Sequence, residues 1–178
     1  MVTVTAETSL SSSVDDAWVA LGRRDTYFDF PGIAPRVGSG SGKTLDHALD
    51  LPIVDRQDQT VTLTVGRAGK NGHRERRFTL RGELVTITGR WRLEPAGAGV
   101  RVHLTLDYDI AAPLKTLAVN TLRSRSPLPI RTDADAILSR AVDEFFETRF
   151  AEQAAAYCEG LRARRSADAG ATRAIGPA

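Results

Sequence analysis

The sequence predicts an α+β domain in which an antiparallel sheet of about seven strands packs against one long C-terminal helix. Three observations support this. Between residues 2 and 110, apolar and polar side chains alternate in several short runs, the pattern of half-buried strands. Short polar or glycine-bearing turns join these runs, which favours antiparallel pairing with one solvated face. A stripe of apolar residues then recurs at three- and four-residue steps over residues 132–165, as in an amphipathic helix.

The predicted C-terminal helix has recognisable ends. Pro127 and Pro129 prevent helix formation just before it, and Thr132 is a suitable N-cap with Asp135 three residues on. Arginines near its C-terminus match the helix dipole. At 1.5 Å per residue the helix is roughly 50 Å long, so it needs an extensive partner surface. The apolar stripe consists of Leu138, Ala141, Val142, Phe145, Phe146, Phe150, Ala154, Tyr157 and Leu161.

The alternating runs give the predicted strands in order. They cover residues 2–10, 33–37, 45–53, 61–65, 77–81, 85–93 and 100–110. Ser13 follows the first run and can cap a short helix through Leu21, with Asp15 and Asp16 in its first turn. Residues 114–122 are suited to a second short helix before the prolines. The sequence therefore predicts one strand, short helices, about six meandering strands and the long helix.

Length and composition indicate a single domain. The chain has 178 residues, of which 1–165 form the predicted domain and 166–178, small and polar, a disordered tail. No apolar run is long enough for a transmembrane helix, and the N-terminus lacks the features of a signal peptide. The single cysteine, Cys158, favours a reducing, cytoplasmic location. A monomer or a homodimer is expected, the latter because a sheet edge can pair with another copy.

The charges are unevenly distributed although the net charge is only +2. Residues 67–92 contain eight lysines and arginines, and residues 133–160 contain seven acids. Two solvated faces explain this pattern most simply. A nucleic-acid or protein-binding surface is the alternative, but the basic stretch has few aromatic residues on which bases could stack. We therefore expect no nucleic-acid partner.

Two motifs resemble functional sites but do not meet their requirements. Residues 38–44 resemble a phosphate-binding loop, yet valine stands where the first glycine is needed, and the following alternation predicts a strand instead of a helix. His103, Asp107 and Asp109 have metal-ligand spacing, but one exposed strand offers no closing ligand. The sequence accordingly predicts neither a metal site nor a cofactor.

Several stretches, taken in order, resemble the Bet v 1/START-type helix-grip superfamily, and in particular its bacterial polyketide-cyclase/dehydrase-like branch (SRPBCC). These are residues 10–21, residues 25–33 with their Pro31-Gly32 turn, and residues 89–102 with the turn around Gly97, followed by the amphipathic helix. The resemblance covers about residues 2–165. It implies a cupped antiparallel sheet wrapped around the C-terminal helix, with a cavity for a hydrophobic small molecule between them.

Strand parity and the helix stripe select the side chains expected to face that cavity. His47 shares the inward face of its strand and is either a core histidine or a polar anchor. Arg76 is either a rim arginine or an anchor for a ligand carboxylate or enolate. Arg149 lies within the helix stripe and points either into the cup or out to solvent. The full predicted ligand-binding set is His47, Leu49, Leu63, Arg76, Phe78, Trp91, Tyr108, Phe145 and Arg149.

The leading functional hypothesis is binding, transport or sequestration of a hydrophobic small molecule such as a lipid, sterol or polyketide. An enzyme of the cyclase, aromatase or dehydratase type is the first alternative. It requires His47, Tyr108 and Arg76 to converge on one cavity. The second alternative is a protein-interaction or regulatory module that uses the basic strands.

Overall fold

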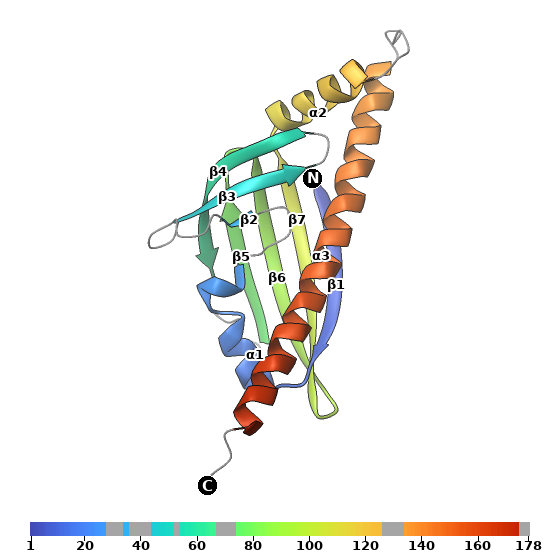
Figure 1. Cartoon of the computed structure of the whole chain (residues 1–178). Helices are drawn as coiled ribbons and strands as arrows, with labels where there is room; N and C mark the ends of the chain where they lie inside the picture. The colour runs from blue at the N-terminus through green and yellow to red at the C-terminus, as the bar shows by residue number, and fades with distance from the viewer. Residues whose placement is uncertain (28–33, 36–43, 52–53, 67–73, 126–133, 175–178) are drawn as a thin grey trace.

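The computed structural model describes residues 1–27, 34–35, 44–51, 54–66, 74–125 and 134–174, and Figure 1 shows their arrangement. Side chains are described throughout these ranges except in 34–35, 44–51, 54–59, 134–135 and 164–174. The fold is α+β, with an antiparallel sheet and a long C-terminal helix that crosses it (Figure 1). This confirms the predicted fold class at that level.

The strands form one continuous antiparallel sheet. Its order is β1-β7-β6-β5-β4-β3-β2, so every strand after β1 lies beside its neighbour in sequence, and β1 closes onto β7. The strands are β1 (Val2–Leu10), β2 (Ala34–Pro35), β3 (Thr44–Leu51), β4 (Val54–Val65), β5 (Arg74–Arg81), β6 (Val85–Ala96) and β7 (Gly99–Ile110). Because β2 has only two residues, the longer strands β1 and β3–β7 make up almost all of the sheet.

Two strands begin earlier than the alternation predicts. β4 starts at Val54 instead of residue 61, and β5 starts at Arg74 instead of residue 77. Their first residues are mostly charged or amide side chains, so hydrophobic periodicity gives no signal there. Backbone pairing extends them: Gln57 and Gln59 pair with Leu49 and His47 of β3, and Arg74 pairs with Leu93 of β6.

Two short helical segments follow β1, as predicted. α1 (Val14–Ala20) is capped by Ser13, whose Oγ accepts a hydrogen bond of 3.1 Å from the backbone N–H of Asp16. The 3₁₀ turn η1 (Arg24–Tyr27) is fixed by the Thr26 hydroxyl, which donates to the Ala20 carbonyl at 2.7 Å. The Thr26 hydrogen bond holds η1 against the C-terminal end of α1.

The C-terminal part contains α2 (Ala112–Arg125) and α3 (Ala134–Ala174). α2 confirms the helix predicted around residues 114–122. α3 was predicted to end at residue 165 and instead continues to Ala174, while residues 175–178 of the predicted tail lie outside the described residues. Alanine and arginine dominate residues 162–174, and both are strong helix formers. The predicted cap at Thr132 lies outside the described residues.

The core lies between the sheet and α3. On β6 and β7 every second residue is buried, and on α3 the buried residues include Val142, Phe146, Phe150 and Ala154. The alternate residues of these strands form the outer, charged face of the sheet. α3 lies along β1 (Figure 1), with one flank against the inner face. Within the described ranges, no helix is both long enough and apolar enough to span a bilayer.

Candidate functional site

The inner face of the sheet supplies the wall of the candidate site. Leu63 on β4, Phe78 on β5, Trp91 on β6 and Tyr108 on β7 are all buried, as strand parity predicts. The backbone register pairs Leu63 with Leu80, Phe78 with Gly89, and Trp91 with Arg76 on one side and Leu104 on the other. The wall is thus built by four adjacent strands.

One end of this wall is an aromatic cluster around Phe78. Its ring centroid lies 4.9 Å from that of Tyr27 and 6.0 Å from that of Trp91, and Trp91 lies 6.1 Å from Tyr157 of α3. Gly89 makes this possible, because a Cβ at that position would lie 1.9 Å from Cζ of Phe78. The ring therefore rests directly on the β6 backbone.

Hydrogen bonds fix the two tyrosines of the cluster. The Tyr27 hydroxyl donates to the Leu21 carbonyl at 2.8 Å, and the Tyr157 hydroxyl donates to the Thr26 carbonyl. Burial raises the pKa of Tyr27 to about 12, although nearby Trp91 and Arg76 act to lower it. The Trp91 indole N–H thus lies near the Tyr27 oxygen.

The other end of the wall is a stack between the sheet and α3. The rings of Tyr108 and Phe150 are nearly parallel, with centroids 3.9 Å apart, and Phe146 stacks on Phe150 at 5.8 Å. Tyr108 is fully buried, and its hydroxyl has no hydrogen-bond partner among the described residues. Burial therefore raises the pKa of Tyr108 strongly and keeps the phenol neutral.

Arg76 is positioned by α1 and by the turn that follows it. Its guanidinium carbon lies 4.2 Å from the ring centroid of Trp18, a cation–π contact. A Cβ on Gly22 would lie 1.9 Å from Nη1 of Arg76, so the glycine provides the space that the guanidinium occupies. Nε of Arg76 is buried without a hydrogen-bond partner among the described residues. The neighbouring Arg74, in contrast, pairs with Asp15.

The sequence left open whether Arg149 points into the cup or out to solvent, and its side chain reaches both environments. Its Nη1 pairs with Glu152 at 3.3 Å near the surface, while its Nε is buried without a partner among the described residues. Gln153, one helical turn later, has a buried Oε1 that also lacks a described partner. Phe145, Arg149 and Gln153 are half-buried and lie along one flank of α3. Gln153 was missed because a single glutamine beside an apolar stripe gives no sequence signal.

The remaining predicted residues lie on β3. His47 and Leu49 belong to the strand and pair with Gln59 and Gln57 of β4, but their side chains lie outside the described residues. Arg76 and Tyr108 are not brought together. Arg76 is aligned with Leu104, four residues from Tyr108 on β7, which places the two residues about 13 Å apart along the strands.

Cys158 is buried on α3, and burial raises the pKa of its thiol to about 12. The ordinary pKa of a cysteine thiol is about 9. We therefore expect the native protein to resist Ellman's reagent below that pH, because the reactive thiolate does not form. Absorbance of the released chromophore measures this, with denatured protein as the reactive control. Rapid labelling of the native protein would show that Cys158 is accessible.

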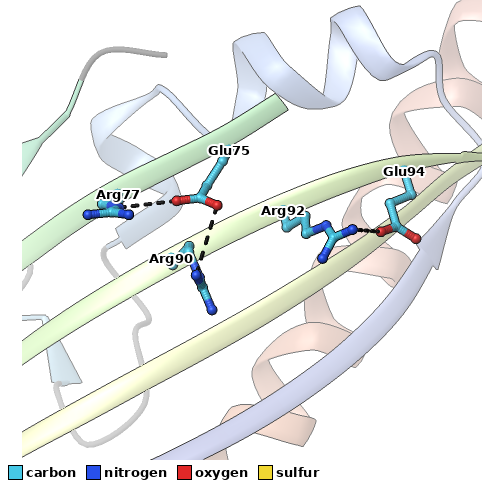
Figure 2. A network of polar contacts seen from close by, with 5 residues as sticks. All are labelled: Glu75, Arg77, Arg90, Arg92 and Glu94. Atoms are coloured by element: carbon cyan, nitrogen blue, oxygen red, sulfur yellow. Dashed lines mark hydrogen bonds and ion pairs between the residues drawn. The ribbon is translucent and has the colours of Figure 1, made fainter. Parts of the chain in front are cut away.

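Three arginines of the basic stretch, Arg77, Arg90 and Arg92, form ion pairs on the outer face of the sheet. Figure 2 shows Glu75 between Arg77 and Arg90, at 3.1 and 3.9 Å, and Arg92 with Glu94 at 2.8 Å. His103 lies between Glu7 and Glu94 on the same face, 3.1 and 3.5 Å away. Ion pairs thus join β1 to β7 through Glu7 and Arg101, and β5 to β6 through Glu75 and Arg90. Among the described residues, no cluster is arranged to hold a metal ion.

Comparison with known proteins was made at the level of sequence and of structure. No known family profile matches the chain. Small ribosomal subunit protein eS6 from Picrophilus torridus is 39% identical over 61 residues, which are 34% of this chain and 47% of that protein. The chain thus matches about half the length of this relative, too little to establish a relationship.

Solved structures match over most of the chain. The protein TTHA0849 from Thermus thermophilus has a TM-score of 0.54 and 16% identity, covering 93% of this chain and 98% of its own. A START superfamily protein from Mycobacterium smegmatis has a TM-score of 0.43 and 15% identity, covering 84% of this chain and 97% of its own. The di-domain ARO/CYC protein StfQ of the steffimycin pathway has a TM-score of 0.41 and 15% identity, covering 86% of this chain and 52% of its own.

The TTHA0849 structure shows a shared fold. Together with the strand order and the long helix across the sheet, it confirms the α+β arrangement of sheet and helix that the sequence resemblance implied. The chain has a helix-grip fold, in which a long C-terminal helix lies across an antiparallel sheet.

Proposed function

We propose that the chain binds a hydrophobic small molecule between the inner face of the sheet and α3. The observation that carries this proposal is the presence of two buried polar atoms without described partners on an otherwise apolar wall, Arg76 Nε and Tyr108 Oη. Buried polar groups normally have partners, and unpaired ones carry a free-energy cost. A ligand with a few oxygen atoms would supply partners at that wall.

The proposed ligand-binding residues are those selected from the sequence. Apolar burial against Leu63, Phe78, Trp91 and Phe145 would provide most of the affinity, at about 25 cal/mol per Å² of apolar area. Arg76 would bind a carboxylate or carbonyl oxygen, since its guanidinium lies on Trp18 and has no carboxylate in the described ion pairs. Tyr108 and Arg149 would contact the ligand further along α3, and His47 and Leu49 from β3.

The alternatives are less well supported. A cyclase or dehydratase of a polyketide-like substrate needs Arg76 and Tyr108 to act at one reaction centre, and the register separates them. Nucleic-acid binding through the basic strands is disfavoured because Arg77, Arg90 and Arg92 already have glutamate partners. We therefore retain binding as the function, in a cytoplasmic protein that is a monomer or homodimer and takes up the ligand without a cofactor.

Displacement of a fluorescent apolar probe, cis-parinaric acid, tests the proposal. Wild-type protein should bind it at one site. Phe145→Ala should weaken binding about tenfold, equivalent to about 1.4 kcal/mol, by removing a ring from the proposed wall. Ile137→Ala is the matched control, because Ile137 is 68% exposed near the start of α3. Equal losses in both variants, or no saturable binding to the wild type, would contradict the proposal.

A further inference from the structure

Three polar side chains lie on β7 and on the part of α3 that packs against it through the Tyr108–Phe150 stack. Tyr108 stacks on Phe150, and Arg149 and Gln153 lie immediately before and three residues after that phenylalanine. Each contributes a buried polar atom without a partner among the described residues: Tyr108 Oη, Arg149 Nε and Gln153 Oε1. Tyr108 itself has no exposed surface. The stack thus places the Tyr108 strand position beside the segment of α3 that carries Arg149 and Gln153.

These atoms define the chemistry of the group that would satisfy them. The Arg149 Nε–H can only donate, Gln153 Oε1 can only accept, and the Tyr108 hydroxyl can do either. The charge of Arg149 is already balanced by Glu152, so a second carboxylate has little electrostatic gain here. An alcohol matches the whole set, because its oxygen accepts from Arg149 or Tyr108 while its hydrogen is donated to Gln153.

The distance from this cluster to Arg76 sets the length of the ligand. Arg76, Trp91 and Leu104 share one register line, and Tyr108 lies four residues beyond Leu104, which corresponds to about 13 Å along β7. The helix rise along α3 gives a similar distance between the two ends. Tyr157 lies against Trp91 and Phe150 against Tyr108, and their seven-residue separation corresponds to about 10 Å of helix. Between the two ends the wall is apolar.

We propose that Tyr108, Arg149 and Gln153 form a second anchor that binds a hydroxyl group of the ligand. This inference rests on the proposed function. The ligand is then an elongated apolar molecule with an acceptor oxygen at the Arg76 end and an alcohol on the order of 10 Å away, as strand and helix rises imply. A purely aliphatic chain would leave the three atoms at the second anchor unsatisfied.

Two matched probes test this: dodecanoate and ω-hydroxydodecanoate, which differ only by the terminal hydroxyl. In a purely apolar cavity the hydroxyl weakens binding, because its burial without partners is unfavourable. At the proposed anchor it strengthens binding. We expect titration calorimetry to show about tenfold tighter binding of ω-hydroxydodecanoate to the wild type, the ratio that corresponds to about 1.4 kcal/mol.

The variant that isolates the anchor is Tyr108→Phe, which removes one oxygen and keeps the ring that stacks on Phe150. It should abolish the preference for the hydroxylated probe, since only the hydroxyl contact is lost. Gln153→Leu should act in the same direction. Ile137→Ala is the control and should retain the preference, because Ile137 is 68% exposed near the start of α3 and contributes nothing to the proposed anchor.

The outcomes distinguish failure of the second anchor from failure of the proposed function. If the wild type binds dodecanoate but shows no preference, or if Tyr108→Phe keeps the preference, the second anchor is wrong while the proposed function stands. If neither probe binds and cis-parinaric acid is not bound either, the proposed function fails and the anchor fails with it.

Discussion

Replacing Phe150 by alanine is expected to lower the free energy of unfolding by about 3–5 kcal/mol, the usual cost of deleting a buried phenylalanine side chain. Phe150 is fully buried and stacks on both Tyr108 and Phe146, so its ring joins α3 to β7. Urea denaturation followed by circular dichroism measures the change. The midpoint should fall without a large change in slope if the folded state keeps its structure.

A control on the same helix separates this role from general helix effects. Ile137→Ala should change stability by no more than about 0.5 kcal/mol, since the isoleucine is 68% exposed and alanine favours helix. If Phe150→Ala were as mild as Ile137→Ala, the described packing of α3 on the sheet would be wrong.

The second large effect is expected at Gly89. A Cβ there would lie 1.9 Å from Cζ of Phe78 and 2.4 and 2.5 Å from its two Cε atoms. Rotation of the ring cannot relieve this overlap, because the whole ring edge faces Gly89. We expect Gly89→Ala to destabilise the protein by about 1–3 kcal/mol or more through overpacking. Thermal or urea unfolding measures the loss.

A second-site change makes this expectation specific. In a Phe78→Leu background the clash is reduced, so adding Gly89→Ala should cost much less than it does in the wild type. The coupling between the two sites, obtained from the double-mutant cycle, should exceed about 0.5 kcal/mol. Additive effects would mean that Phe78 does not rest on Gly89 and that the aromatic cluster is arranged differently.

Much of this fold could be predicted from the sequence because one face of each element is apolar. Alternation located Leu63, Phe78, Trp91 and Tyr108 on the inner face of the sheet, and all four are buried. The stripe on α3 was found in the same way. Such periodic signals identify which face of an element is buried, and in this chain the sheet and helix bury those faces against each other.

The rest depended on contacts between distant residues, which periodicity does not report. Charged residues at the start of β4 and β5 concealed the true length of these strands, which backbone pairing extends. The space for Arg76 depends on Gly22, and that for Phe78 on Gly89. Gln153 gains its significance only because Tyr108 and Phe150 stack beside it. Whether Arg149 faced in or out was undecided because its side chain spans both environments.

Native mass spectrometry of the protein, purified from the organism that encodes it, tests the proposed binding function most directly. We expect a species heavier than the 19.3 kDa chain by the mass of one small organic molecule. The added mass should disappear on denaturation and be recovered in an organic extract. A protein that carries only its own mass, and that also fails to take up cis-parinaric acid, would contradict the binding function proposed for the inner face of the sheet and α3.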